Sequence, residues 1–448
     1  MKGENRLRIS VSGIRGRVPE ALNVEIASRF SSAFSSYIEE GKIAVCRDFR
    51  CSSHMLEMAV ISSIVACGID CVDFGQLPTP FLQFLMREEG FSGGIAVSAG
   101  HNPLPWNAVI LLNEGGNYLE PGEGSEVFNI YEAGDFKKAS WKNLGSVEKG
   151  IFPVESYLRD ISRLVNIERI RGAGFKVVAD PCNSVASVFL GAFGDFFGLD
   201  LISINDDPEK PFPHPPDPSS KNASQVEAVV KGTNADLGFL LNSDGSRISF
   251  VSERGEALNE EFTLPLCLIS LKDRINKAVT TVATSGLADC AAEMAGVKLI
   301  RTRVGQSAVV HMMEAEKAEA GGEGSGSFVL SSFSSGYDSL LSLALVLDLL
   351  SREHKSLSEI ASPFPKFFMK KVKIESSPVE MYKSMDKLEE VYSKENPDFT
   401  DGIRIERKGV WFIIRPSSTE FILRLIIEGE NEELVRSVEE EVKERMQL

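Results

Sequence analysis

A polar segment in the first quarter of the chain has the position of an active-site loop. It reads Val97-Ser98-Ala99-Gly100-His101-Asn102-Pro103 and continues to Trp106-Asn107. Gly100 can take backbone angles that other residues adopt only at a cost, and Asn102-Pro103 favours a turn. The apolar stretches Gly94–Val97 and Ala108–Leu112 flank the segment, which predicts a loop between two strands. An ordinary surface loop has a similar composition, so the residues alone leave both interpretations open.

A segment near the C-terminus is suited to a phosphate group. It reads Arg415-Pro416-Ser417-Ser418-Thr419-Glu420, and Arg424 follows it. A guanidinium can bind phosphate through two parallel hydrogen bonds, while hydroxyls and the backbone N–H groups of a turn supply further donors. This pattern predicts an anion site. A smaller anion-binding turn is predicted around Arg15, which lies between two glycines in Ser12-Gly13-Ile14-Arg15-Gly16.

Two further loops are candidates for ligand binding. Polar residues recur at every second position of Asn242-Ser243-Asp244-Gly245-Ser246-Arg247, an arrangement that can direct oxygen atoms at a cation. Mg²⁺ prefers carboxylates, however, and Asp244 is the only one, so a cation site and a plain polar turn both stay open. Gly321–Ser327 is glycine-rich, a composition that is more typical of linkers. The remaining histidines show no metal spacing and are predicted to lie on helix faces or in loops: His54, His214, His311 and His354.

Composition limits the class of protein. A chain of 448 residues exceeds the size at which one hydrophobic core keeps growing, which predicts three or four domains. The formal net charge of −16 argues against nucleic acid as a main partner. Seven cysteines without a Cys-x-x-Cys pair, such as Cys67, Cys71 and Cys267, are expected to be reduced core residues. Without an apolar leader, and with Leu340–Leu350 too short to cross a bilayer, the chain is expected to be cytoplasmic and free of membrane contact.

A pattern of strand, helix, glycine and second strand recurs three times and must position these loops. The copies cover residues 42–74, 175–204 and 278–302, and in each a glycine ends the helix. They predict three tandem α/β domains, in which ligands bind beyond the carboxyl ends of the strands. Composition places these domains at 1–150, 151–257 and 258–365. Residues 113–149 are rich in Gly and Glu with little periodicity, and a new helix is expected to start within Ile151–Ile170.

Residues 366–448 follow a different order. A strand, a helix, a hairpin, a further strand and a final helix over Glu432–Met446 predict a small α+β domain. Asn431 is the expected N-cap of the last helix.

Together these loops resemble those of the α-D-phosphohexomutases, the family of phosphomannomutase, phosphoglucomutase and phosphoglucosamine mutase. The family's loops read Thr-Ala-Ser-His-Asn-Pro, Asp-Gly-Asp-x-Asp-Arg, Gly-Glu-x-Ser-Gly-His and Arg-Pro-Ser-Gly-Thr-Glu-Pro, and their counterparts occur here in the same order. The resemblance implies a four-domain cleft that binds a hexose phosphate. It also implies that Arg15 faces the phosphoserine loop, that Arg247 is the family's arginine, that Glu323 and Ser325 bind sugar hydroxyls, and that the phosphate-binding residues are Arg415, Ser417, Ser418, Thr419 and Arg424.

The chain departs from the family pattern at the positions where family members have their nucleophile, acid or base groups and Mg²⁺ ligands. Gly100 stands where the family has its phosphorylated serine, and Ile110 where many members have a lysine proposed as general base. Asn242 and Ser246 replace two of the three aspartates that hold Mg²⁺. Ser327 replaces a histidine that is a candidate acid or base, and Val304-Gly305-Gln306-Ser307 lacks the basic residue often found there.

These departures lead to three hypotheses. The first is a phosphosugar-binding pseudoenzyme in which Mg²⁺ binding is weak or absent, because hard cations are held mainly by charge. The second is an active mutase, an intramolecular phosphotransferase, in which Ser98 is a substitute nucleophile beside His101 and Arg15. The third is a non-catalytic subunit that associates with an active paralogue. A homo-oligomer is compatible with each hypothesis.

Overall fold

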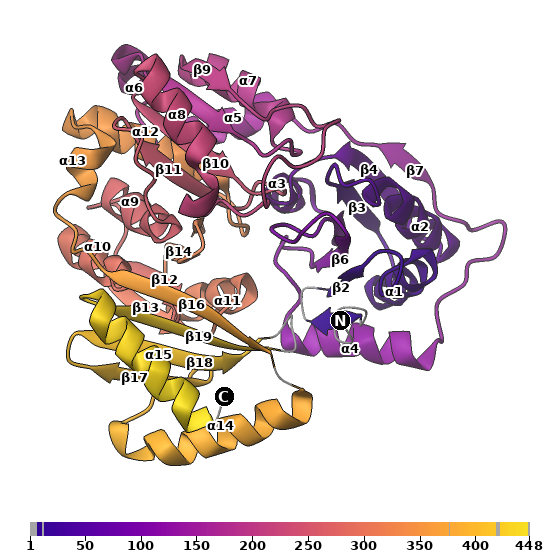
Figure 1. Cartoon of the computed structure of the whole chain (residues 1–448). Helices are drawn as coiled ribbons and strands as arrows, with labels where there is room; N and C mark the ends of the chain where they lie inside the picture. The colour runs from indigo at the N-terminus through magenta and orange to yellow at the C-terminus, as the bar shows by residue number, and fades with distance from the viewer. Residues whose placement is uncertain (1–6, 11–12, 376, 418–421, 447–448) are drawn as a thin grey trace.

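Four β-sheets, each covered by helices, follow one another along the chain in the computed structural model, which describes residues 7–10, 13–375, 377–417 and 422–446 (Figure 1). The first sheet has seven strands and each of the others has four. In Figure 1 the four units form an arc, with the first on the right and the fourth at the lower left. The predicted class, three α/β units followed by an α+β unit, is confirmed.

The first sheet has the strand order β1-β2-β6-β5-β3-β4-β7. Its strands are β1 (Arg8–Ser10), β2 (Gly13–Arg17), β3 (Lys42–Arg47), β4 (Asp70–Gln76), β5 (Gly93–Val97), β6 (Trp106–Leu112) and β7 (Val147–Lys149). Its helices are α1 (Val24–Ile38), α2 (Ser53–Ala66), α3 (Thr79–Glu89) and α4 (Pro121–Ala133). Strands β3, β4 and β5 pair in parallel, whereas β6 pairs antiparallel with β5. The polar loop after Val97 therefore lies at the carboxyl end of a parallel strand.

The second and third sheets repeat this arrangement on a smaller scale. Their strand orders are β11-β10-β8-β9 and β13-β12-β14-β15, and in each the last strand of the unit joins the edge antiparallel. The strands are β8 (Lys176–Asp180), β9 (Asp200–Ser203), β10 (Leu237–Leu241), β11 (Ile248–Ser252), β12 (Lys277–Thr281), β13 (Lys298–Thr302), β14 (Ala320–Glu323) and β15 (Ser327–Leu330). The α-helices are α5 (Val154–Ser162), α6 (Ile167–Ala173), α7 (Ser187–Phe197), α8 (Ser224–Thr233), α9 (Thr263–Ser270), α10 (Leu287–Ala295), α11 (Gln306–Glu316), α12 (Ser339–Glu353) and α13 (Leu357–Ala361), with 3₁₀ turns η1 (Ser220–Asn222) and η2 (Glu260–Phe262).

One topological relation positions three of the four predicted loops. The loops over residues 98–105, 242–247 and 324–326 each join a strand that has a parallel neighbour to the antiparallel strand beside it. Each loop thus leaves the carboxyl end of its sheet at an equivalent place. Ligands of parallel sheets bind at such ends, so each loop occupies the place where its own sheet would bind a ligand.

The fourth sheet is antiparallel throughout, in the order β16-β19-β18-β17. Its elements are β16 (Phe368–Glu375), α14 (Pro378–Tyr392), η3 (Ser393–Glu395), β17 (Ile403–Arg407), β18 (Val410–Pro416), β19 (Ile422–Gly429) and α15 (Glu432–Met446). Asn431 accepts a hydrogen bond from Leu434 N at 2.9 Å, which confirms the predicted N-cap. Val435, Val438 and Val442 are buried against this sheet, so α15 closes the fourth core.

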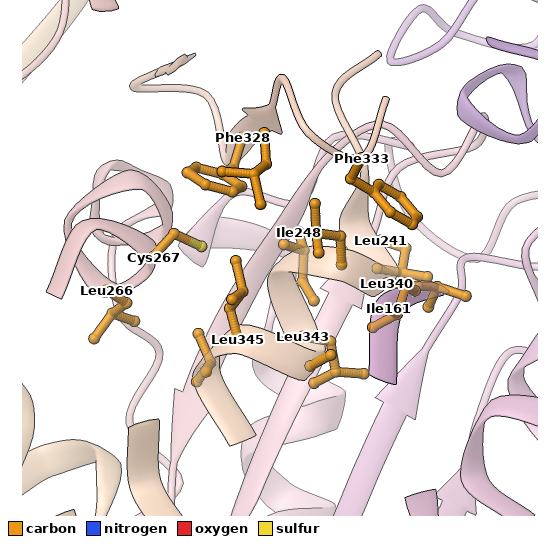
Figure 2. Packing of buried hydrophobic residues seen from close by; sticks show 14 of the residues in the cluster. Ile161, Leu241, Ile248, Leu266, Cys267, Phe328, Phe333, Leu340, Leu343 and Leu345 are labelled. Carbon is orange, nitrogen blue, oxygen red and sulfur yellow. The ribbon is translucent and has the colours of Figure 1, made fainter. Parts of the chain in front are cut away.

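The second and third units share one hydrophobic core. Leu241 and Ile248 of the second sheet pack with Phe328 and with α12 in a cluster that crosses both units (Figure 2). Helix α12 contains the predicted apolar stretch Leu340–Leu350, and its leucines are buried on every side. The same cluster continues into one face of the first unit, through residues such as Phe81 and Ile110, whereas the other face of that sheet and the fourth unit have separate cores. The first three units are therefore packed through one continuous cluster.

The linking segments contain more helical structure than their sequence pattern indicated. Residues 113–149 contain α4, where Pro121 and the capping pair Glu120 and Glu123 begin a helix that buries only Val127, so apolar periodicity was too weak to reveal it. Two helices, α5 and α6, start within Ile151–Ile170, where one was expected. All seven cysteines are free. None of the helices in the described ranges is long and apolar enough to cross a bilayer.

Candidate active-site cleft

One buried arginine fixes the shape of the loop after β5. Arg50 donates from its two terminal nitrogens to four backbone carbonyls: Gly100 at 2.7 Å, Asn102 at 2.7 Å, Pro103 at 2.9 Å and Trp106 at 3.2 Å. Its side chain is inaccessible to solvent, and its Nε pairs with Asp48 at 3.1 Å. Because a guanidinium is always charged and offers donors in a rigid plane, it holds the loop in one conformation.

Ser98 contacts the same carboxylate, Asp48, as Arg50 does. Its Oγ donates to Asp48 Oδ2 at 2.8 Å, and the residue is only 2% exposed. The other oxygen of Asp48 accepts from Ser53 Oγ at 2.5 Å and from Arg50 N at 3.0 Å. The hydroxyl of Ser98 therefore satisfies a buried carboxylate rather than facing the cleft.

Gly100 lies where two units meet. Its φ is +53°, in the left-handed region that favours glycine. A Cβ at this position would lie 2.8 Å from Asp244 Oδ2, and Ser243 Oγ donates to Gly100 O at 2.5 Å. The structure thus brings together the two loops in which the sequence predicted the nucleophile and the cation. The side chain that would join them is absent from this sequence.

The predicted cation loop is closed on itself by hydrogen bonds. Asn242 Nδ2 donates to Asp244 Oδ1 at 2.7 Å and to Ser246 Oγ at 3.0 Å. Ser246 Oγ in turn donates to Asp244 Oδ1 at 2.6 Å. An amide nitrogen, a donor, therefore lies among the oxygens that a cation would need as ligands. Arg247 N donates to Asn242 Oδ1 at 3.0 Å, which sets the orientation of that amide.

The cleft around the first loop is positively charged. The guanidinium of Arg247, burial, and the guanidinium groups of Arg15, Arg424 and Arg50 hold the pKa of His101 well below its usual range. The imidazole is therefore neutral at pH 7. With four arginines around it, this part of the cleft is suited to an anion.

Arg15 and Arg247 have partners that position them. Arg15 Nη1 donates to Asn102 Oδ1 at 2.6 Å, and burial lowers the pKa of this arginine, with Tyr118 and Asp244 acting in the opposite direction. Arg247 Nη1 lies 3.7 Å from Asp217 Oδ1. Arg15 thus contacts the loop after β5, while Arg247 is oriented toward the proline-rich loop. Ile110 is 4% exposed in the core of the first sheet, so no polar group replaces the family's lysine at that position.

The glycine-rich loop is a tight turn rather than a linker. Glu323 ends β14 and accepts a hydrogen bond from Gly305 N at 2.9 Å. A Cβ on Gly324 would lie 1.7 Å from Glu261 Oε2, so only glycine fits there. Ser325 Oγ and Ser327 Oγ are 3.1 Å apart, and Ser327 is fully buried. Glu323 and Ser325 are thereby held at the carboxyl end of the third sheet.

The structure places two of the predicted phosphate ligands side by side. Arg415 on β18 and Arg424 on β19 are opposite each other in the strand register. Arg415 is 6% exposed and its Nε lies 2.9 Å from Asp401 Oδ2. Burial lowers the pKa of Arg415, and Asp401 opposes this shift. Like charges on facing residues repel each other, so an anion between them is stabilising. Ser417 belongs to the described residues, whereas Ser418 and Thr419 lie outside them.

Sequence reasoning missed the residues that support the loops. Asp48 and Arg50 follow β3, and Asp180 ends β8, positions where polar residues at a strand's carboxyl end were a usable signal. Asp180 Oδ2 lies 3.2 Å from His214 Nε2, which anchors the proline-rich loop 206–222. The ring of Phe212 in that loop lies 5.1 Å from the Arg50 guanidinium. His311 shows no metal spacing in the sequence, but in the structure one of its ring nitrogens lies within 4.8 Å of a carboxylate oxygen of exposed Glu120 and of exposed Glu314.

The fold and the site thus define a protein of four tandem domains with a cluster of arginines at the loop after β5, and comparison with known proteins gives the family. Four family models match in succession: phosphoglucomutase/phosphomannomutase alpha/beta/alpha domain I over residues 7–138, domain II over 155–255, domain III over 261–367 and the C-terminal domain, domain IV, over 369–445. The chain is 33% identical over 430 residues to a probable phosphoglucosamine mutase from Pyrococcus horikoshii, covering 94% of each chain. It therefore belongs to the phosphoglucomutase/phosphomannomutase family, the α-D-phosphohexomutases.

Other relatives are consistent with this assignment. The phosphoglucosamine/phosphogalactosamine mutase from Sulfurisphaera tokodaii is 29% identical, over 96% of this chain and 97% of that protein. Among solved structures, a phosphoglucomutase/phosphomannomutase family protein from Burkholderia thailandensis has a TM-score of 0.85 at 23% identity, over 98% of each chain. An Aspergillus fumigatus N-acetylphosphoglucosamine mutase, solved with GlcNAc-6P and magnesium, has a TM-score of 0.56 at 14% identity, over 90% of this chain and 82% of that one. These two structures support the four-domain fold.

Proposed function

We propose that this protein binds a hexose phosphate in the cleft between its four domains without carrying out the usual mutase reaction. The observation that carries the proposal is the glycine at position 100, which has no side chain to phosphorylate. The position faces the predicted cation loop, because a Cβ there would lie 2.8 Å from Asp244 Oδ2. Phosphoryl transfer through the enzyme needs a nucleophile at that point. Binding requires only the donors that surround the cleft.

The ligands around Asp244 support the same conclusion about Mg²⁺. Two neutral side chains, Asn242 and Ser246, already satisfy one oxygen of its carboxylate. A hard divalent cation would have to displace these hydrogen bonds and would gain a single negative ligand from the loop. The residues present do not fit Mg²⁺, and we infer that binding is weak or absent.

Candidate binding groups support the proposal. Arg415 and Arg424 face each other on neighbouring strands, and Arg424 also lies close enough to His101 to act on it together with Arg15 and Arg247. Glu323 and Ser325 belong to the third domain. Several relatives are named phosphoglucosamine mutases, so glucosamine 6-phosphate is a ligand to test together with glucose 1-phosphate and mannose 1-phosphate.

One observation favours the alternative of an active mutase. The contact between Ser98 Oγ and Asp48 Oδ2, at 2.8 Å, has the geometry of a nucleophile and a general base. Incubation with glucose 1,6-bisphosphate followed by intact-mass measurement separates the two functions. We expect the mass to stay unchanged while calorimetry detects ligand binding. A phosphoryl group mapped to Ser98 would contradict the proposal, and so would a protein that binds no sugar phosphate at millimolar concentration.

Association with an active paralogue, or with a second copy of the chain, stays a prediction. Size-exclusion chromatography with light scattering measures both directly.

A further inference from the structure

One carboxylate links domain III to domain IV at the cleft. Asp401, in the turn before β17, accepts a hydrogen bond from Val304 N at 3.0 Å and forms the ion pair with Arg415 Nε at 2.9 Å. Val304 belongs to the loop after β13 of domain III, and Arg415 is the arginine of domain IV for which phosphate binding is proposed. The orientation of this arginine relative to domain III therefore depends on Asp401.

The next residue of the same loop extends the connection to the sugar-binding loop. Gly305 N donates to Glu323 Oε1 at 2.9 Å. Gly305 has a φ of +123°, which favours glycine, and the successive amides of Val304 and Gly305 bind two different carboxylates. An unbroken series of contacts thus runs from Arg415 through Asp401 and the loop backbone to Glu323.

The turn that carries Asp401 is closely packed. A Cβ on Gly402, whose φ is +93°, would lie 2.3 Å from Ile414 O and 2.8 Å from Arg415 Cβ. Arg303 Nε also donates to Thr400 O at 3.1 Å, which gives a second link between the same two segments. Only 20% of the Asp401 side chain is exposed. The turn and the loop therefore meet in one defined arrangement.

We propose that Asp401 is a positioning residue that couples phosphate recognition by Arg415 to sugar recognition by Glu323. The inference rests on the proposed binding of hexose phosphates in this cleft. A ligand that reaches both groups makes two contacts at once, and the second is favourable only when the two groups are already held at the correct spacing. Inorganic phosphate makes only the first contact, so it reports on Arg415 alone.

The substitution Asp401→Asn separates these contributions. Asparagine keeps an acceptor for Val304 N but removes the charge that holds Arg415. We expect the affinity ratio of glucose 1-phosphate to inorganic phosphate, measured by calorimetry, to fall about tenfold. The affinity for inorganic phosphate should stay the same or increase, because a negative charge beside the anion is removed. Glu406→Gln is the matched control, since it neutralises another acid of domain IV, one that pairs with Arg404 instead of Arg415.

Two results of this titration would overturn the proposal. One is an unchanged ratio, and the other is an equal loss of both affinities, which is what general damage to domain IV would cause.

Amide hydrogen exchange tests the coupling without a ligand. In Asp401→Ala, exchange should become faster at Val304, which loses its acceptor, and also at Gly305, which loses its support. Unchanged protection at Gly305 would overturn the coupling. If the wild-type protein binds neither ligand, the proposed function fails, and the exchange result at Gly305 still decides whether Asp401 couples the loops.

Discussion

The hydroxyl of Ser98 donates a 2.8 Å hydrogen bond to Asp48, and Asp48 is itself only 1% exposed. We therefore expect Ser98→Ala to weaken the fold rather than the ligand site. The loss of one bond to a buried carboxylate costs about 1–3 kcal/mol, seen as a lower melting temperature. Sugar-phosphate affinity by calorimetry should change less than twofold. Ser62→Ala, on an exposed face of α2, is the control. A loss of phosphoryl labelling in Ser98→Ala would instead identify Ser98 as the nucleophile.

The double substitution of Asn242→Asp and Ser246→Asp should create a Mg²⁺ site. Three carboxylates close together repel one another, so the double variant should melt at a lower temperature than wild type in the absence of metal and recover when Mg²⁺ is added. Calorimetry should detect saturable binding in the variant and none at micromolar Mg²⁺ in the wild type. Adding Asp244→Ala should abolish the new site. Micromolar binding by the wild-type protein that disappears in Asp244→Ala would refute our interpretation of this loop.

Gly100→Ser alone should not produce mutase turnover. A serine at φ +53° is strained by about 1 kcal/mol, its Cβ would lie 2.8 Å from Asp244 Oδ2, and its hydroxyl would have no cation beside it. Groups that act as a unit are strongly non-additive, so one restored member recovers little. Gly100→Ser combined with Asn242→Asp and Ser246→Asp, with or without Ile110→Lys, is the first variant expected to convert glucose 1-phosphate to glucose 6-phosphate. Turnover by Gly100→Ser alone would show that the metal loop is dispensable.

Arg415→Ala should weaken sugar-phosphate binding by at least tenfold, because a bidentate charged contact is lost from a buried site. The measurement is the shift in melting temperature with millimolar glucose 1-phosphate, which raises that of the wild type by stabilising the native state. The exposed Arg436→Ala on α15 should behave as wild type. An equal shift in Arg415→Ala would place the phosphate elsewhere in the cleft.

The pair Asp180 and His214 predicts a loss of stability in alkaline solution. Burial alone would lower the pKa of His214, but hydrogen bonds to Asp180 and Cys182 raise it to about 10. The folded chain therefore holds this proton more tightly than the unfolded chain, whose histidine titrates near pH 6.5. The stabilisation is complete below about pH 6.5 and is lost as the pH rises through about 10.

Asp180→Asn tests this pH dependence. The variant should melt at a lower temperature than wild type at pH 6, and the two should converge toward pH 10. His54→Gln, which changes an exposed histidine, should follow the wild type across this range. If the difference in melting temperature between wild type and Asp180→Asn stays the same at every pH, the pair has no pH-dependent role.

The sequence revealed the strands and the loops at their ends because both leave local patterns. Apolar runs such as Leu237–Leu241 stop abruptly at polar residues, and the following loop falls where a sheet binds its ligand. Contacts between distant segments leave no such pattern. Arg50 donates hydrogen bonds to carbonyls about fifty residues away in the sequence. The hydrogen bond from Val304 N to Asp401 depends on how domains III and IV pack together. The orientation of the Asn242 amide could not be predicted from the sequence either. It is set by hydrogen bonds with Arg247 N and Ser246 Oγ, which form only when the loop has folded.

The bonds from Arg50 to four loop carbonyls have a consequence for how this protein tolerates change. On the loop side they involve backbone carbonyls alone, so these hydrogen bonds do not themselves depend on which side chains the loop displays. The glycine at position 100 is the exception, because a side chain there would meet the Asp244 carboxylate at a left-handed φ. A substitution of Arg50 would instead remove the support of all four carbonyls at once.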